Sequence, residues 1–320
     1  MKLHDTQITN YLTFCKSQKC LDVKTIRAYK IDLTHFASTM PAETSLYDIA
    51  SRQIESYIAH LHSIYKPKTA KRKIASLKAF FHYCEFYEFI ERNPFDKIQI
   101  RFREPVILPK TIPLQTLELF LSTIYNQRQL ATTSYQQKNA LRDAAVIELL
   151  FATGIRISEL CSLKSCDVNL NDNFVLIYGK GSKERKLQIG NDNVLKTLNE
   201  YKNTFSKEIE NCGHFFANQS GKPLSDQSVR RMIQKYASLA GIDQHITPHM
   251  FRHTFASSLL DADVDIRYIQ EMLGHSSITT TQIYTHLFLP KDSATVVLFL
   301  HPQHAFRSLC KPVQTSLKKP

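Results

Sequence analysis

The C-terminal part of the chain carries histidine, arginine and tyrosine residues in closely spaced short motifs. They are His249-Met-Phe-Arg252-His253, Leu273-Gly-His275 and Gln282-Ile-Tyr284-Thr-His286, and a further arginine stands far upstream in Thr153-Gly-Ile-Arg156-Ile-Ser-Glu159. Guanidinium groups bind phosphate oxygens with a planar fork, imidazoles transfer protons near neutral pH, and a tyrosine hydroxyl can act as a covalent nucleophile. Together these residue types predict phosphodiester chemistry on a nucleic acid, with the protein carrying the intermediate.

Each of these residues, taken alone, has a simpler interpretation. A lone histidine is usually a hydrogen-bonded core residue, a lone tyrosine usually packs, and Arg156 could pair with Glu159 three residues on. A zinc site through His249 and His253 would lack the glutamate of a His-Glu-x-x-His motif and would place a cationic arginine beside the metal. We therefore expect no metal site and no cofactor.

Two groups of basic residues could contact DNA. Between residues 63 and 81 six basic residues occur without an acidic one: Lys66, Lys68, Lys71, Arg72, Lys73 and Lys78. A run of one sign on helices favours contact with a phosphate backbone over a merely solvated face. The second group follows the turn Gly179-Lys180-Gly181, where Lys183, Arg185 and Lys186 form a basic ribbon that could lie in a DNA groove.

The bulk composition agrees with a polyanionic partner. The 320 residues carry a formal net charge of +12 and a pI of about 9.3, which favours nucleic acid or an anionic membrane surface. No apolar run approaches the ~20 residues of a spanning helix, and the N-terminus lacks the apolar segment of a secretory signal. The seven cysteines include no Cys-x-x-Cys pair. We expect a cytoplasmic protein with reduced thiols and no membrane partner.

The first 100 residues are expected to form a helical bundle. Apolar residues recur at helical spacing in four segments, with Ser51 as a candidate cap of the third helix. Pro67 is a favourable first residue for the fourth, which Asn93-Pro94 should end. Residues 101–113 contain three prolines and are predicted to be a linker.

Residues 114–290 are expected to form a mixed second domain. Helical periodicity returns from Leu114 to Thr153, with a polar loop over 127–137. Two β-rich runs, 174–178 and 185–189, flank the glycine turn and predict an antiparallel pair, with a third short strand before Val168 or near Phe215. Five more helices are predicted over residues 193–205, 225–240, 247–260, 265–273 and 277–286. The fold class is therefore mainly α with a small antiparallel β-sheet.

Five separated motifs in order resemble the tyrosine recombinase (phage integrase) family, within it the Xer-like and mobile-element integrases. They are Ala152-Thr-Gly-Ile-Arg-Ile-Ser-Glu-Leu160, Gly179-Lys-Gly-Ser-Lys-Glu-Arg185, Pro248-His-Met-Phe-Arg-His-Thr-Phe-Ala256, Leu273-Gly-His-Ser276 and Thr280-Thr-Gln-Ile-Tyr-Thr-His286. The resemblance spans residues 1–290 and is compositional in the N-terminal bundle. Five motifs together are more specific than any one of them, and they outweigh the simpler interpretations of the single residues.

The resemblance implies a role for each matching residue. Arg156 and Arg252 would hold the scissile phosphate, and Tyr284 would attack phosphorus to form a 3′-phosphotyrosyl link. Lys180 would protonate the departing 5′-oxygen, His249 would handle the proton of the nucleophile, and His275 would donate a hydrogen bond to the phosphate. Glu159 would orient the residues that bind the phosphate without contacting the phosphate itself.

The resemblance also implies an assembly. The 1–100 bundle and the 114–290 catalytic domain would clamp double-stranded DNA. Four copies would join two sites through a Holliday junction, and a related recombinase could replace some of these copies. The apolar start of 291–320 would dock on a neighbouring copy, and its end would be a basic tail. The biological role would be integration or excision of a mobile element, or resolution of DNA multimers. The alternatives are relaxation of DNA by a type IB topoisomerase and a non-catalytic DNA-binding regulator of the same fold.

Overall fold

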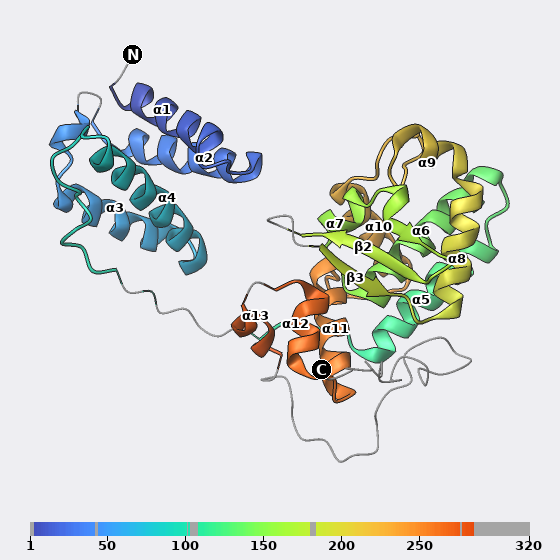
Figure 1. The fold of residues 1–320 in the computed structure, drawn as a ribbon. Coiled ribbons are helices and arrows are strands. Elements are labelled where there is room, and N and C mark those ends of the chain that lie inside the picture. The colour runs from blue at the N-terminus through green and yellow to red at the C-terminus, as the bar shows by residue number, and fades with distance from the viewer. Residues whose placement is uncertain are drawn as a thin grey trace, which may run out of the picture. The chain divides into compact units, whose positions relative to one another are not determined.

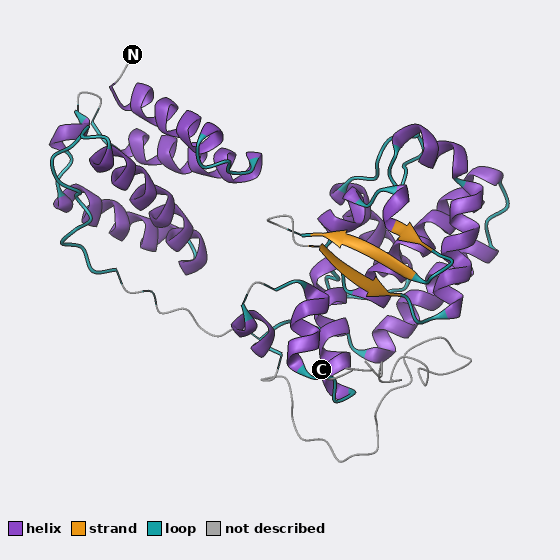
Figure 2. Ribbon diagram, in the orientation of Figure 1, coloured by secondary structure: helices purple, strands orange, loops and turns teal. Residues whose placement is uncertain are grey.

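The computed structural model describes residues 3–41, 44–100, 102, 108–179, 184–275 and 277–284. The chain forms two compact units, residues 1–106 and 107–320 (Figure 1). Helices dominate both units, and the strands that the structure describes lie in the second (Figure 2). The predicted fold class, mainly helical with a small antiparallel sheet, is confirmed.

The first unit is a bundle of four helices around an aromatic core. The helices are α1 (Leu3–Ser17), α2 (Val23–Thr39), α3 (Ser51–Ile64) and α4 (Pro67–Phe86), with a short 3-10 turn η1 (Leu46–Asp48). Tyr11, Phe36 and Phe81 are fully or almost fully buried between them. Pro67 occupies the first turn of α4 as predicted, because its missing N–H would have no partner there.

Two details of this bundle differ from the prediction. Ser51 does not cap α3: it is the first helical residue, and its hydroxyl donates to the carbonyl of Pro94 at 2.8 Å. The fourth helix does not extend to Asn93. It ends at Phe86, because Glu88 adopts a left-handed conformation with φ of 57°.

The second unit is organised around one central helix, α6. Its helices and strands are α5 (Leu114–Gln129), α6 (Ser134–Thr153), α7 (Ile157–Ser162), η2 (Ser165–Asp167), β1 (Val168–Asn169), β2 (Phe174–Tyr178), β3 (Glu184–Gln188), α8 (Asp192–Thr204), α9 (Ser206–Cys212), α10 (Asp226–Leu239), α11 (Pro248–Asp261), α12 (Ile266–Leu273) and α13 (Ile278–Gln282). Helix α6 packs against α5, α8 and α11, and is buried on nearly all sides from Ala140 to Leu150.

The predicted loop over 127–137 is largely wrong. Helix α5 continues to Gln129 and α6 already begins at Ser134. The start is fixed by Thr133, whose hydroxyl accepts the backbone N–H of Gln136 at 3.2 Å. The sequence is polar there because both helix ends are exposed.

The sheet is antiparallel in the order β1-β2-β3. Its third strand begins at Val168, whereas the prediction placed it before Val168 or near Phe215. In the β2–β3 pair, Ile177 lies opposite Arg185 and Val175 opposite Leu187. Alternate residues of a strand point to opposite faces. Arg185 therefore shares the inner face with buried Leu187, whereas Lys186 is exposed on the other face.

The last helices that the structure describes carry the C-terminal motifs. Helix α11 packs on α6, α12 packs on α11 and β3, and α13 packs on α12 (Figure 1). Lys180 and Lys183 of the hairpin lie outside the described residues, as does the segment 291–320 for which docking was predicted.

Candidate active site

The site begins where the central helix ends. Gly154 ends α6 with a left-handed φ of 58°, which a residue with a side chain adopts only at a cost. A Cβ at this position would also overlap the ring of Phe255 on α11. The tight turn brings the next residues directly into α7, with Arg156 at its N-cap. The Thr-Gly-Ile-Arg motif is thus a helix end packed against α11.

Glu159 is the anionic centre of the site. Its carboxylate accepts the backbone N–H of Arg156 at 2.8 Å, the side chain of Arg156 at 2.9 Å, and both terminal nitrogens of Arg185 at 2.6 and 3.1 Å. Burial alone would raise the pKa of Glu159. The hydrogen bonds from Arg185 and Arg156 outweigh burial, so the pKa is lowered and the group is ionised.

The C-terminus of α12 fixes three arginines at once. The carbonyl of Met272 accepts from Nε of Arg185 at 2.8 Å, the carbonyl of Leu273 accepts from Nη2 of Arg252, and the carbonyl of Gly274 accepts from Nη2 of Arg156 at 3.2 Å. These carbonyls have no partner within the helix and carry its partial negative charge. Three consecutive carbonyls therefore hold three guanidiniums in defined orientations.

Arg252 is the most deeply buried cation of the site. It is 4% exposed, and its Nη1 donates to the carbonyl of Gly154 at 2.8 Å. Burial lowers the pKa of Arg252 to about 10, with a further contribution from the positive charge of Arg156. The two carbonyl contacts use two of the five N–H groups of a guanidinium. The others can serve an anion.

The tyrosine hydroxyl lies beside these arginines. Tyr284 is 2% exposed and packs on Ile269 and Leu273, but its hydroxyl is 2.9 Å from Nδ1 of His253. Burial raises the pKa of Tyr284, whereas the charges of Arg252 and Arg156 lower it in part. The phenol is therefore within electrostatic reach of both arginines and remains protonated at neutral pH.

His275 forms the other wall around the phenol. Its ring stacks with that of Tyr284 at a centroid distance of 6.5 Å, and its Nδ1 is 2.9 Å from the hydroxyl of Thr281. Burial, followed by the charge of Arg252, lowers the pKa of His275 to about 4. His275 is neutral at physiological pH, so one of its nitrogens can donate a hydrogen bond without a net charge.

The structure brings Arg156 and Glu159 together with Arg252, His275 and Tyr284, which lie about a hundred or more positions later in the chain. His249 is exposed on α11, with its ring 6.4 Å from that of His253. The geometry therefore places His253, not His249, against the phenol. Sequence reasoning considered His253 only as a metal ligand, and the position of Tyr284 relative to α11 was the missing information.

Arg185 is placed differently from the predicted basic ribbon. Its side chain is 8% exposed and its guanidinium is held by Glu159 and Met272. The prediction that it lines a DNA groove is not supported by this position. Strand alternation was the available signal, because Arg185 and the apolar Leu187 must share a face.

The basic residues of α4 are mostly on its surface. Lys66, Lys68, Lys71, Arg72 and Lys78 are exposed. Arg72 also pairs with Asp32, and Lys78 lies over the ring of Phe95. Lys73 is the exception: it is 5% exposed and bonded to buried Asp32 at 3.3 Å. It stabilises the bundle rather than offering a surface contact, contrary to its predicted role.

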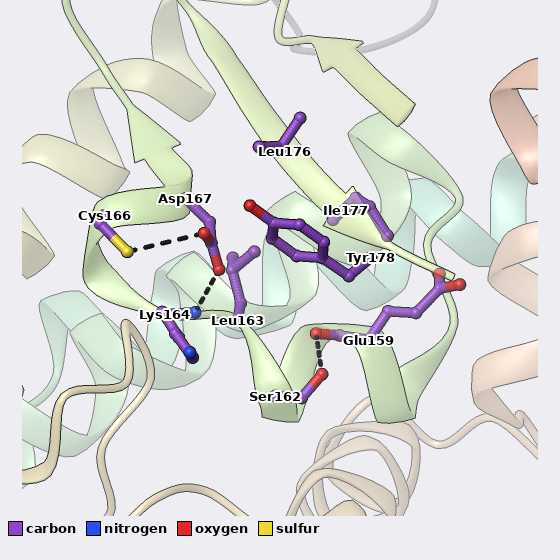
Figure 3. Close-up of a pocket in the computed structure, with 9 residues that line it drawn as sticks. All are labelled: Glu159, Ser162, Leu163, Lys164, Cys166, Asp167, Leu176, Ile177 and Tyr178. Atoms are coloured by element: carbon purple, nitrogen blue, oxygen red, sulfur yellow. Dashed lines mark hydrogen bonds between the residues drawn. The ribbon is translucent and has the colours of Figure 1, made fainter. Parts of the chain in front are cut away.

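A cavity of about 380 Å³ lies next to the cluster, between α7, η2 and β2 (Figure 3). Its lining residues are Glu159, Ser162, Leu163, Lys164, Cys166, Asp167, Leu176, Ile177 and Tyr178. Of the clustered residues only Glu159 reaches it. The reactive groups thus lie beside this cavity rather than in it.

Neither a membrane span nor a metal-binding cluster is found in the part of the chain that the structure describes. No described helix is long and apolar enough to cross a bilayer, and no group of three or more His, Cys, Asp or Glu side chains in the described ranges could hold a metal ion. Paired guanidiniums beside a phenol suit a tetrahedral anion that the phenol attacks.

Comparison with known proteins adds the family context. Residues 124–289 match the phage integrase family, and residues 8–85 match the phage integrase N-terminal SAM-like domain. A protein named tyrosine recombinase from Agathobacter rectalis is 65% identical over 94% of this chain and 98% of its own length. Tyrosine recombinase XerD of Listeria innocua is 35% identical over 88% of this chain and 93% of its own.

A solved structure has the same fold. The XerH site-specific recombinase, in a pre-cleavage complex with its difH substrate, aligns with a TM-score of 0.67 and 24% identity over 86% of this chain and 80% of that one. At this identity the similarity concerns the fold alone.

Proposed function

Because this chain belongs to the phage integrase family, as a site-specific tyrosine recombinase that breaks and rejoins DNA strands, we propose that its Tyr284 is the nucleophile. The observation that carries the proposal is the position of the phenol, bonded to His253 and within electrostatic reach of Arg252 and Arg156. The attack joins Oη of Tyr284 to phosphorus at the 3′ side of the break and releases a 5′-hydroxyl. The DNA is then held as a 3′-phosphotyrosyl ester.

The cations bind and stabilise the reacting phosphate. Arg156 and Arg252 contact its non-bridging oxygens with the guanidinium N–H groups that do not donate to helix-end carbonyls. His275 adds a hydrogen bond to the phosphate, and exposed His249 handles the proton of the nucleophile. Lys180, which lies between β2 and β3 in the sequence, protonates the departing 5′-oxygen. Glu159 keeps Arg156 in place. Because negative charge grows on the equatorial oxygens during transfer, preformed cations favour the transition state.

The reaction needs neither a metal ion nor ATP. Two arginines and a lysine supply the positive charge, and the phosphotyrosyl ester conserves the energy of the broken bond for rejoining. We expect full strand cleavage in EDTA and without nucleotide. Turnover that depends on a divalent metal would contradict the assignment.

The two units bind the DNA on which the site acts. We propose that exposed Lys66, Lys68, Lys71, Arg72 and Lys78 of α4 contact phosphates. Both units would then clamp a duplex, joined by the proline-rich segment 101–113. The net charge of +12 supports such a footprint.

Assembly follows from the reaction. Exchange between two DNA sites, each bound by two copies, requires a tetramer. A related recombinase can replace some of these copies when it supplies an equivalent active site. Residues 291–320 would supply the docking element and tail. We propose a cytoplasmic enzyme, consistent with six described cysteines that are all unpaired. Its biological role would be integration or excision of a mobile element, or resolution of DNA multimers.

The decisive experiment is trapping of the covalent adduct. The wild type should form a protein–DNA adduct on a nicked suicide duplex, and Tyr284→Phe should form none. Tyr268→Phe is the matched control, because Tyr268 on α12 is 66% exposed. Adducts that persist in Tyr284→Phe would show that the nucleophile is another residue.

Tyr284 is within electrostatic reach of Arg252 and Arg156 of its own chain, which supports cleavage in cis. A mixture of Tyr284→Phe and Arg252→Ala should therefore remain inactive on suicide duplexes. Restored cleavage in the mixture would show that the tyrosine is delivered to a neighbouring copy.

The family match does not favour the two alternatives, and a plasmid assay separates them. A type IB topoisomerase would relax a supercoiled plasmid that lacks a recombination site, and a regulator would bind DNA without forming an adduct. The recombinase should act only on plasmids that carry its sites.

A further inference from the structure

One buried carboxylate of the N-terminal bundle is paired with more positive charge than its own. Asp32 lies on α2, which packs against α4 (Figure 1), and 1% of its side chain is exposed. Its Oδ1 accepts from Nζ of Lys73 at 3.3 Å, and its Oδ2 accepts from the hydroxyl of Ser76 at 2.8 Å and from Nη1 of Arg72. A buried carboxylate is costly unless it is paired and hydrogen-bonded. Here two cations from adjacent positions of α4 pair with a single carboxylate.

Lys73 alone satisfies the need for charge compensation. Its side chain is 6% exposed, and its ammonium contacts Asp32 and lies over the ring of Tyr65, 5.0 Å from the ring centroid. This pair places one positive charge against one negative charge inside the bundle. Arg72 is different, because 47% of its side chain is exposed. The contact between Asp32 and Arg72 therefore affects the orientation of an exposed arginine more than the charge balance of the core.

The contact restricts the direction in which the guanidinium of Arg72 can point. An arginine presents its N–H groups in one rigid plane, so a bond at Nη1 limits the directions of the others. A long exposed side chain otherwise loses rotamer freedom when it binds a ligand, and prior ordering reduces that loss. Lys68, four residues earlier on the same face of α4, is exposed and carries a point charge on a flexible stem. The two side chains thus offer a phosphate different contacts, one oriented fork and one adaptable charge.

The charges of the group leave Arg72 able to bind an anion. After Asp32 and Lys73 neutralise each other, the positive charge of Arg72 remains. The sequence from residue 63 to residue 81 contains no acidic residue, so this part of α4 supplies no competing carboxylate. Asp32 can therefore orient Arg72 without removing its attraction for a phosphate.

We infer that Asp32 is a positioning residue, which holds the guanidinium of Arg72 in the orientation that binds one particular DNA phosphate. The inference rests on the proposed function, which assigns the exposed basic residues of α4 to the DNA backbone, and deepens it. Phosphate contacts fix the register of a protein on a duplex. An oriented arginine does so with two parallel N–H bonds, whereas a lysine contributes affinity at any nearby phosphate. Asp32 thus makes Arg72 the contact that sets the register of the first unit on DNA.

The test measures how much single DNA phosphates contribute to binding. Each of a set of duplexes carries the sequence that the protein protects in footprinting, with one phosphate replaced by an uncharged methylphosphonate. One replacement should weaken binding of the wild type about tenfold, the range for a hydrogen bond to a charged group, and this sensitivity should disappear in Arg72→Gln. Arg72→Lys keeps the charge and the pair of Asp32 with Lys73. The fold and the salt dependence of its binding should therefore persist, but its sensitivity at that phosphate should fall below about threefold.

Asp32→Asn tests the positioning directly, because it keeps the size of the side chain and removes the charge that holds Arg72. It should lower the sensitivity at the Arg72 phosphate to the level of Arg72→Lys. The double variant should lose no more sensitivity than either single variant, since both remove the same orientation. Lys68→Gln should leave the sensitivity at this phosphate intact and lower it at another.

A buried carboxylate of the second unit provides the matched control. Asp143 pairs with Arg142, whose side chain is only 11% exposed, and accepts from the hydroxyl of Tyr236 at 3.1 Å. Asp143→Asn removes a buried charge in the same way, and it should lower stability towards urea as Asp32→Asn does. It should leave the sensitivity at the Arg72 phosphate unchanged. Binding is compared under conditions in which both variants are folded.

The outcomes are distinguishable. The inference is overturned by an Asp32→Asn variant that keeps the tenfold sensitivity, or that binds every duplex of the set more weakly by the same factor, as a purely structural defect would. Undiminished sensitivity in Arg72→Lys would also overturn it, and so would an Arg72-dependent loss with 7-deazaguanine in place of a guanine, which would assign Arg72 to a base. In each case the proposed function stands as long as the wild type forms adducts that require Tyr284. Conversely, the phosphate sensitivity can be measured in protein that forms no adduct.

Discussion

Three glycines with nearly the same backbone conformation allow the geometry of the site to be tested one contact at a time. Gly154, Gly241 and Gly274 have φ of 58°, 64° and 62°, and all lie in the second unit. Replacement by alanine forces a side chain into the left-handed region, which costs about 1 kcal/mol at each position. The backbone penalty is thus common to all three, and differences between the variants report the surroundings of the new Cβ.

The surroundings differ sharply. At Gly241 a Cβ would meet nothing within 4 Å, so only the backbone penalty of about 1 kcal/mol applies. At Gly274 it would lie 3.0 Å from Nη1 of Arg185, which must shift by a few tenths of an ångström. At Gly154 it would overlap the ring of Phe255, and overpacking of this kind adds about 1–3 kcal/mol.

Urea unfolding and suicide-substrate cleavage measure the two consequences separately. We expect stability losses in the order Gly241→Ala, Gly274→Ala, Gly154→Ala, with the last losing about 3 kcal/mol in total. Cleavage by folded protein should be unchanged in Gly241→Ala. It should fall about 10- to 100-fold in Gly274→Ala, because the displaced Arg185 moves Glu159 and with it Arg156.

Two results would refute this reasoning. Equal stability losses at all three positions would mean that the packing around Gly154 and Gly274 is looser than the structure shows. Wild-type cleavage by a folded Gly274→Ala variant would mean that the position of Arg185 does not matter for Arg156, the arginine that we propose binds phosphate.

Other parts of the chain give independent tests. Burial raises the pKa of Glu148 from 4.5 to about 8 and outweighs the opposing effect of the Thr197 side chain, so the folded state keeps a proton that the unfolded state loses. Wild-type stability in urea should therefore fall as the pH rises from about 5 to about 8, by about 3 kcal/mol up to pH 7, and Glu148→Gln should remove this slope; a variant that keeps the slope would place the titrating group elsewhere. Lys73→Met should destabilise the bundle by about 2 kcal/mol while leaving the salt dependence of DNA affinity intact. Lys68→Met should instead reduce the slope of log affinity against log salt concentration by about one. Identical slopes in the two variants would argue against the assignment of Lys68 to a phosphate. Arg185→Gln should lower cleavage about 100-fold with little change in DNA affinity. Lys186 is exposed on the same strand, and Lys186→Gln should leave the cleavage rate unchanged. Equal losses of cleavage in the two variants would show a role for the outer face of the β2–β3 pair.

Residue patterns alone predicted the parts of the fold that depend on local preferences. The four helices of the bundle, the antiparallel pairing of β2 with β3 and the proline start of α4 were predictable from periodicity and turn residues. The same rules failed where local and tertiary preferences compete. The polar stretch after Gln127 was interpreted as a loop, but the cap of Thr133 and the packing of α6 keep most of it helical.

The burial of single charges could not be predicted by charge runs. Lys73 stands in the middle of a basic segment, yet it is the position that faces the bundle interior and meets Asp32, which lies forty-one positions earlier in the chain. Nothing local distinguishes it from Lys71. For Arg185 the alternation of the strand does predict burial, because Arg185 shares a face with the buried Leu187. This signal is more reliable there than the basic character of the neighbouring residues.

Several contacts of the candidate active site are made by backbone carbonyls. Every residue has a backbone carbonyl, so the residue types alone could not predict these contacts. The sequence motif Leu273-Gly-His275 indicates a histidine near phosphate, but the structure shows that the carbonyls beside it hold the arginines. The glycine matters because its left-handed conformation ends α12 and leaves these carbonyls without helical donors. The choice of His253 over His249 as neighbour of the phenol likewise depends on where the chain returns after α13.

In the proposed reaction, the charge of the cluster favours the transition state over bound substrate. Three guanidiniums face one carboxylate, and Arg185 and Glu159 largely neutralise each other, so Arg156 and Arg252 remain as two uncompensated charges. A phosphodiester carries one negative charge, and a second develops on its oxygens as the phenol attacks. The helix-end carbonyls hold both arginines in position before DNA arrives, so little reorganisation is needed when the second charge appears. Removal of Arg252 must therefore reduce the rate of cleavage far more than the affinity for DNA.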